Sequence, residues 1–222
     1  MACDITSAFL RRHVVERMES IIDEEQKITH SKFTDEVETF LSDPKCLKKI
    51  KAPPEAQSDS VDWAYSPIFQ SGGKYDLKPS ASSNDNQLHF GTILCSLGIR
   101  YNSYCSNISR TYLVQPTRAQ EQNYELLLEA QHAAIDALRD GATMKQVYNA
   151  AYKVVASKKS DLQHNLTKNF GFGVSSHKPF PSVTQQHSPL KKKNKKKKPM
   201  MFRLVLSLRS LVLQFPPKTR RL

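Results

Sequence analysis

Residues 93–101 alternate between apolar and small or polar side chains, and this pattern restricts the possible folds more than any other feature of the chain. The apolar positions are Ile93, Cys95, Leu97, Ile99 and Tyr101. A period-two pattern of this kind is typical of a β-strand with one buried face. Asn102 and Ser103 can form a turn, after which residues 108–114 can return as the partner strand. The sequence therefore predicts an antiparallel strand pair.

Two helices are predicted before this pair. Residues 7–26 have the helical spacing of an amphipathic helix, with a buried stripe made of Leu10, Val14, Met18, Ile21 and Ile22. Thr29 or Ser31 can cap the start of the second helix, and Pro44 can end it. Its expected buried residues are Phe33, Val37, Phe40 and Leu41.

Two more helices are predicted after the strand pair, and each begins with a capping box. Thr117 with Gln120, and Thr143 with Gln146, have the required spacing. Gly141 is well placed to end the first of these helices. Its expected apolar side is Tyr124, Leu127, Leu128, Ile135 and Leu138. The expected buried positions of the second are Val147, Ala151, Val154 and Val155.

This order of elements predicts the α+β class, with an antiparallel sheet and flanking helices. The expected domain covers residues 1–173. Within it we expect helices over 7–43, a polar loop over 43–62, the sheet over 63–114 and helices over 117–157.

The basic charge of the chain is concentrated near its C-terminus. The formal net charge is +12, but residues 178–222 hold 13 Lys and Arg and no acidic residue, so residues 1–177, with 20 basic and 21 acidic residues, carry −1. Residues 174–222 also lack sustained periodicity, which predicts a disordered, low-complexity basic tail. The most apolar run, residues 201–215, is interrupted by two arginines and is shorter than the roughly 20 residues that span a bilayer, so no membrane association is expected.

Several stretches resemble one family. Residues 61–114, which include QSGGKYDL and GIRYNSYCSNISRT, resemble the N-terminal region of the large subunit of FACT, the eukaryotic histone chaperone complex. Residues 15–38, 123–155 and 166–173 extend the resemblance. It implies a partial, truncated pita-bread domain, similar to aminopeptidases but without peptidase activity or cofactor. It also implies a nuclear, chromosomal location, with core histones and nucleosomes as partners and, in the full-length protein, the HMG-type small subunit.

The resemblance also identifies two degenerate ligand positions. Methionine aminopeptidases and prolidases place one metal-binding Asp two residues before a Gly and another three residues before an Arg-Thr pair. The matching residues here are Ser96 and Asn107. Two neutral side chains do not balance the charge of two divalent cations. The family's substrate-facing His and its further His and Glu ligands also have no counterpart, since no Glu follows Glu129. No catalytic residue and no bound metal are therefore expected.

A lysine run stands apart from this domain. It consists of Lys191, Lys192, Lys193, Lys195, Lys196, Lys197 and Lys198. It resembles a nuclear-import signal or a tether for non-specific DNA contact, and the competing interpretation is a low-complexity run without a selected role. Seven phosphate contacts would give log affinity a slope of about −6 against log salt.

The leading hypothesis is a non-catalytic histone-chaperone module that acts on nucleosomes in transcription, replication and repair by binding histones or other chromatin proteins. Alternatives are a metallo-aminopeptidase or dipeptidase of the same fold, a basic nucleic-acid-binding protein, and a non-functional truncated fragment. Because the sequence departs from the family pattern from about Val174, we expect the tail to derive from a retained intron, a wrong splice junction or a frameshifted gene model.

Overall fold

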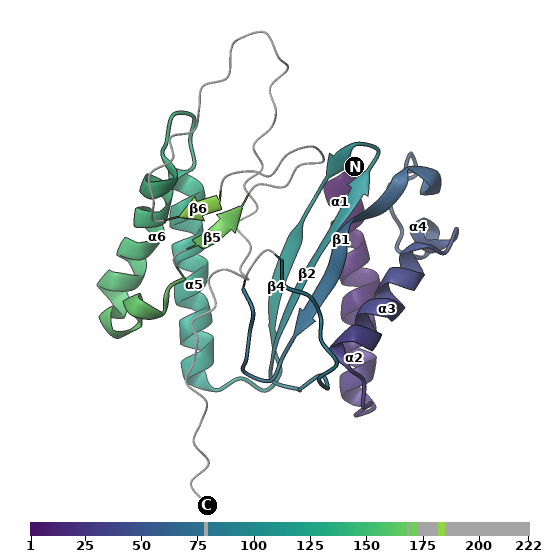
Figure 1. Cartoon of the computed structure of the whole chain (residues 1–222), viewed down its shortest axis with the longest axis horizontal. Helices are drawn as coiled ribbons and strands as arrows, with labels where there is room; N and C mark the ends of the chain where they lie inside the picture. Colours follow the sequence, from purple (N-terminus) through teal and green to yellow (C-terminus); the bar gives the residue numbers. More distant parts are fainter. Residues whose placement is uncertain (78–79, 168, 173–181, 185–222) are drawn as a thin grey trace, which may run out of the picture. The chain divides into compact units, whose positions relative to one another are not determined.

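The structure is a computed structural model, and it describes residues 1–77, 80–167, 169–172 and 182–184 (Figure 1). The chain divides into two compact units, the first holding Met1–Gln115 and the second starting at Pro116. None of the helices in the described residues combines the length and the apolar character needed to cross a membrane.

The first unit is built on an antiparallel sheet in which β2 is central. Its strands are β1 (Val61–Gln70), β2 (Thr92–Tyr101), β3 (Tyr104–Cys105) and β4 (Ile108–Leu113). β2 pairs with β1 on one side and with β4 and the short β3 on the other. Asn102 has a φ of +53°, and the turn that it forms with Ser103 joins the paired residues Tyr101 and Tyr104. The antiparallel pair expected from the sequence is confirmed.

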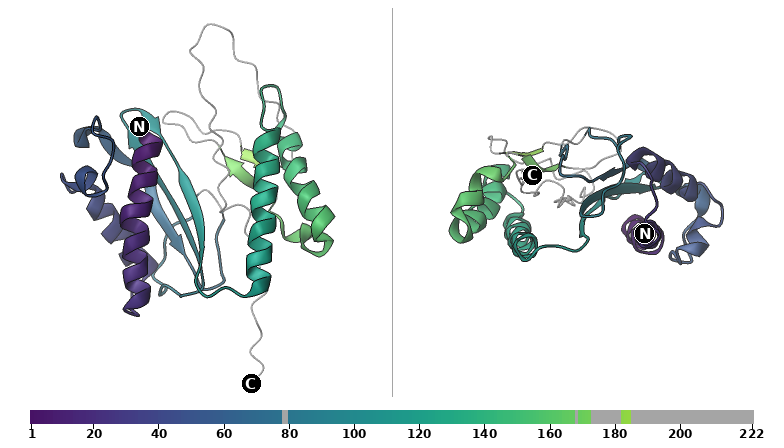
Figure 2. Two further views of the ribbon diagram at one scale, coloured as in Figure 1. Left: turned by 180° about the vertical axis from the view of Figure 1, so that it is seen from behind. Right: turned by 90° about the horizontal axis from the view of Figure 1, so that it is seen from below.

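Helices pack on one face of this sheet (Figures 1 and 2). The first helical stretch runs through α1 (Ala2–Phe9), one π-helical turn (Leu10–Val15) and α2 (Glu16–Asp23), and α3 (His30–Leu41) follows. The first helical stretch begins at Ala2, five residues before the expected Ser7, because the buried Ile5 and Phe9 extend its apolar stripe toward the N-terminus. Thr29 is the cap of α3, where its side chain accepts a hydrogen bond from the Lys32 amide.

The segment expected to be a polar loop over 43–62 contains the short helix α4 (Cys46–Lys49) and a 3₁₀ turn (Ser58–Ser60). Cys46 and Ile50 are buried, with 2% and 0% of their surface exposed. These two apolar anchors explain why a lysine-rich stretch forms a turn of helix against the core.

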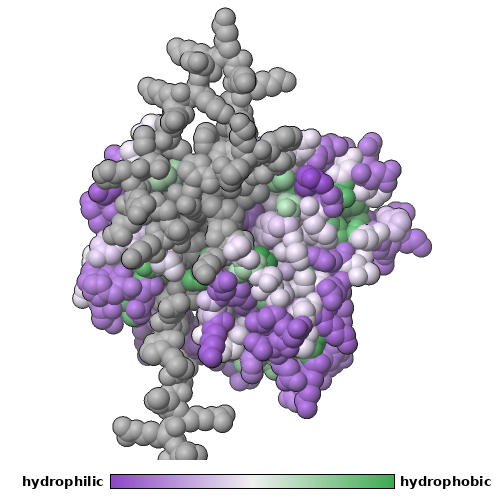
Figure 3. Space-filling view, viewed as in Figure 1, coloured by the Kyte–Doolittle hydropathy of each residue, from purple (hydrophilic) through white to green (hydrophobic). Residues whose placement is uncertain are grey.

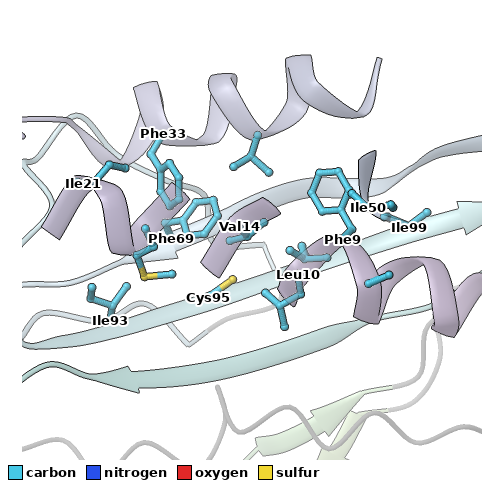
Figure 4. Packing of buried hydrophobic residues seen from close by; sticks show 14 of the residues in the cluster. Phe9, Leu10, Val14, Ile21, Phe33, Ile50, Phe69, Ile93, Cys95 and Ile99 are labelled. Carbon is cyan, nitrogen blue, oxygen red and sulfur yellow. The ribbon is translucent and has the colours of Figure 1, made fainter. Parts of the chain in front are cut away.

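The core of the first unit lies between the helices and the sheet (Figure 4). It includes Phe9, Val14, Ile21, Phe33, Phe69, Ile93, Cys95, Leu97 and Ile99. The prediction of a single buried face for β2 is wrong, because Leu94, Ser96 and Gly98 are buried as well. At Gly98 the cause is the Tyr65 ring, which lies where a side chain would project.

Polar contacts hold the segment after β1 against α3. His30 is buried, and its ring nitrogens contact Asn84 Oδ1 at 2.8 Å and Ser71 Oγ at 2.7 Å. The hydroxyl of Thr34 lies 2.6 Å from that of Ser83. No local sequence pattern predicts this network, since its members are up to 54 residues apart.

The second unit contains α5 (Arg118–Ala137), α6 (Met144–Lys158), a 3₁₀ turn (Ser160–Asn165) and β5 (Asn169–Phe172), which pairs with β6 (Ser182–Thr184). Both expected capping boxes are present. β6 lies within the tail that the sequence predicts to be disordered, and the rest of that tail lies outside the described residues.

The prediction of which residues form the apolar side of α5 is largely wrong. Its buried residues are Asn123, Leu126, Leu127, Ala130 and Ala134. Of the expected set only Leu127 is buried, and Ile135 is 48% exposed. The two small alanines belong to the core that α5 shares with α6, where Val147, Ala151 and Val155 are buried as expected and Val154 is half-buried.

Candidate functional site

The two positions expected from the sequence, Ser96 and Asn107, lie on neighbouring segments of the first unit. Ser96 is in the middle of β2, where it is paired with Ile68 of β1 and Ser109 of β4. Asn107 lies between β3 and β4, where the strand ladder is interrupted. Both side chains contact the hydroxyl of Tyr65, so the fold brings the two expected residues to one place.

Irregularities in β1 place Tyr65 between them. The pairing of β1 with β2 shifts register on both sides of Tyr65, once after Trp63 and once before Ile68. Such bulges redirect side chains. The Tyr65 ring consequently packs over Gly98, where the Cβ of any larger residue would lie 2.6 Å from Tyr65 Cε1 and 2.7 Å from the carbonyl oxygen of Ser106. A glycine at 98 is required for this close approach.

The hydroxyl protons around Tyr65 can be assigned one after another. Tyr65 Oη donates to Asn107 Oδ1 in a short hydrogen bond. Its single proton is then used, so Ser96 Oγ, 2.9 Å away, donates to Tyr65 Oη. Ser109 Oγ in turn donates to Ser96 Oγ at 2.7 Å. Ser109, Ser96, Tyr65 and Asn107 thus form a chain of hydrogen bonds with one direction, called here the Tyr65 chain.

Asn107 ends the Tyr65 chain with one group unused. Its Nδ2 is buried and has no hydrogen-bond partner among the described residues. Ser96 and Ser109 are both 3% exposed, whereas Tyr65 and Asn107 are half-buried. Neither Tyr65 nor Ser109 was identified from the sequence. Ser109 could have been found from the antiparallel register opposite Ser96, whereas the bulges that direct Tyr65 leave no mark in a period-two pattern.

His13, which has no metal-ligand spacing in the sequence, lies in an aromatic cluster of the same unit. Its ring stacks on Phe40, with centroids 3.5 Å apart, and meets Phe9 edge-on at 5.3 Å. Burial, and then the charges of Arg17 and Lys49, lower the pKa of His13 from 6.5 to about 4. The imidazole is therefore neutral at physiological pH and has the role of a packed ring.

The remaining expected site residues, the lysine run from Lys191 to Lys198, lie outside the described residues.

Comparison with known proteins identifies the family. A family model described as "Metallopeptidase family M24" matches residues 1–205. The chain belongs to metallopeptidase family M24. Solved structures agree with this assignment: the prolidase of Pyrococcus furiosus covers 86% of this chain and half of its own, with a TM-score of 0.60 and 24% identity. That likeness shows the fold, and the α+β pita-bread class expected from the sequence is confirmed.

Within M24 the chain is most informatively compared with FACT subunits. It is 42% identical to "FACT complex subunit SPT16" of Yarrowia lipolytica over 78% of its length, and 45% identical to that of Oryza sativa over 77%. The solved N-terminal domain of SPT16 from chickpea is 39% identical, covers 84% of this chain and 44% of its own, and has a TM-score of 0.73. The resemblance to FACT large subunits is confirmed. The chain spans 16–18% of the length of these two curated relatives.

The residues of the Tyr65 chain do not suit the metals of an M24 peptidase. Divalent cations of this kind prefer anionic oxygen ligands, whereas the four side chains here are two serine hydroxyls, a phenol and an amide. Their hydroxyl protons are already used within the chain of hydrogen bonds. In the part of the molecule that the structure describes, no group of three or more His, Cys, Asp or Glu residues is arranged to hold a metal ion.

Proposed function

We propose that this chain is a non-catalytic module of a FACT-type histone chaperone, which binds histones or other chromatin proteins on nucleosomes in the nucleus. The similarity to SPT16 subunits from a yeast and a plant supports this assignment. In a full-length protein of this type, the HMG-type small subunit is the expected partner.

The Tyr65 chain is the observation that carries the non-catalytic part of the proposal. Ser96 and Asn107 take the places of two metal-binding aspartates in the enzymatic relatives. Both side chains are neutral and both are hydrogen-bonded to the Tyr65 hydroxyl, so these two positions offer no anionic ligand to a metal. A peptidase scaffold is thereby retained as a stable binding surface.

Capture of purified core histones at physiological salt tests the proposal. The full chain is compared with a variant in which the seven lysines between Lys191 and Lys198 are replaced by Gln, because that run is expected to contribute non-specific DNA contact. We expect the variant to retain histones. Loss of all histone binding in the variant would contradict a chaperone role for the folded part. Stoichiometric metal by elemental analysis, together with release of N-terminal residues from peptides, would instead establish the peptidase.

A further inference from the structure

The segment around α4 is rich in exposed lysines. Residues 45–51, KCLKKIK, contain four lysines, all exposed. Lys49 is neutralised by Asp43, at 2.6 Å, and lies 5.4 Å from the centre of the Phe40 ring. Lys45, Lys48 and Lys51 form no ion pair with a carboxylate of the described residues. These three are called here the α4 lysines.

The backbone beneath the α4 lysines is firmly held. Cys46 and Ile50 anchor it in the core. Arg12, from the π-helical turn, donates through Nη1 to the carbonyl oxygens of Ile50 at 2.9 Å and Lys51 at 3.3 Å. Lys51 itself has a φ of +49°, a left-handed conformation that costs free energy in a residue other than glycine.

Arg12 satisfies those carbonyls by adding a fourth positive charge beside the α4 lysines. Asp43 lies within electrostatic range of Lys45 as well as Lys49, but one carboxylate does not balance all these positive charges, so an approaching anion would be attracted. In the part of the first unit where α3 and α4 lie, Figure 3 shows mainly hydrophilic residues, interrupted by a small group of hydrophobic ones. A basic partner such as a histone would be repelled here.

The chemistry of the surface favours phosphate over an acidic protein. Protein partners are usually anchored by a few buried Trp, Tyr or Arg side chains, whereas phosphate backbones are contacted by exposed basic and polar groups without an apolar anchor. The large apolar side chains that are exposed in the described residues are Met1, Phe90, Tyr104 and Ile135, all from other segments. We propose that the α4 lysines are a contact site for the phosphate backbone of duplex DNA, independent of the lysine run at 191–198.

Salt dependence gives the proposal a quantitative form. Each phosphate neutralised on duplex DNA contributes about −0.9 to the slope of log affinity against log salt. Contacts from three lysines predict a contribution of about −2.7. The contact would be blind to base sequence, because lysine carries no information about base edges when it binds phosphate.

The test uses the full chain with the seven tail lysines already replaced by Gln, so that the tail does not mask the folded part. In this background, Lys45→Gln, Lys48→Gln and Lys51→Gln are combined in one variant. The matched control combines Lys27→Gln, Lys32→Gln and Lys153→Gln, which removes the same charge from scattered exposed positions. Binding to a labelled duplex is followed by fluorescence anisotropy between about 50 and 200 mM salt.

We expect the α4 variant to lose about tenfold or more in affinity at the lowest salt. The slope of its log affinity against log salt should move toward zero by about 2.7, and the slope of the control should change by less than about one. A variant with Lys→Arg at the same three positions should bind like the background, which separates charge loss from unfolding. Equal losses in the α4 variant and the control, or no binding by the background, would overturn the proposal. The proposal would also be overturned if the α4 lysines contributed to binding of polyglutamate and did not contribute to binding of the duplex.

Discussion

At the scale of single residues, the Tyr65 hydroxyl is the group on which the Tyr65 chain depends. Tyr65→Phe leaves the ring over Gly98 but removes the acceptor of Ser96 and the donor to Asn107. Because buried polar groups left without a partner are costly, we expect a loss of about 1–3 kcal/mol in the free energy of unfolding. Urea denaturation with an unchanged m-value measures it.

Tyr104→Phe is the matched control, since Tyr104 is 51% exposed. We expect this substitution to change stability by less than about 0.5 kcal/mol. If Tyr65→Phe were equally harmless, the hydroxyl would contribute nothing to the fold, and the proposal that the Tyr65 chain stands in place of metal ligands would lose its support.

His13 makes stability depend on pH. Its folded pKa, about 4, lies below its ordinary value of 6.5, so between these values the unfolded chain binds a proton that the folded chain does not. Stability is therefore complete above about pH 6.5 and falls as the pH decreases toward 4. His13→Phe preserves the ring stack with Phe40 and removes the titration.

Urea midpoints at about pH 7 and about pH 5 measure this effect. We expect the midpoint to fall less in His13→Phe than in the unchanged chain. The carboxylates, including Asp43, whose hydrogen bond with Lys49 lowers its pKa, titrate alike in both proteins and cancel in the comparison. An equal fall in the two proteins would show that His13 does not sense pH.

At the scale of elements, the capping boxes fix where α5 and α6 begin. The side chains of Thr117 and Thr143 accept hydrogen bonds from the amides of Gln120 and Gln146. Thr143→Ala should lower the free energy of unfolding by about 0.5–2 kcal/mol, as should Thr117→Ala. Thermal unfolding followed by far-UV circular dichroism checks this. Thr→Ser at each position keeps the capping oxygen, and a Ser variant as unstable as the Ala variant would rule out capping as the cause.

Elements with local signals could be predicted from the sequence. The β2–β4 pair, the turn at Asn102 and both capping boxes depend on neighbouring residues, and the structure contains them all. The buried face of α5 could not be predicted, because the small Ala130 and Ala134 give a weak apolar signal in the sequence. They are buried because α5 and α6 pack closely in the core that they share. Ser96 and Asn107 were identified by family resemblance. Tyr65 depends on bulges that tertiary pairing creates, so no local pattern could identify it.

At the scale of the whole molecule, the described residues form two hydrophobic clusters with no member in common. One belongs to the sheet and helices α1 to α4, and the other to α5, α6 and the segment after them. A chain with separate cores is expected to unfold in units rather than in a single step. The one tryptophan, Trp63, packs against the first cluster, which makes its fluorescence a reporter for that unit alone.

Leu127→Ala tests whether the two units unfold independently. Leu127 is 8% exposed in the second cluster, and removing its side chain should cost that unit about 2–5 kcal/mol. We expect the part of the helical circular dichroism signal that comes from the second unit to be lost at a lower urea concentration than in the unchanged chain. The midpoint of Trp63 fluorescence should stay the same. Leu97→Ala, at a fully buried position of the first cluster, is the converse control and should shift the fluorescence midpoint. If Leu127→Ala shifted both signals equally, the two cores would be coupled into one cooperative unit, and a binding surface on the first unit could not be studied apart from the second.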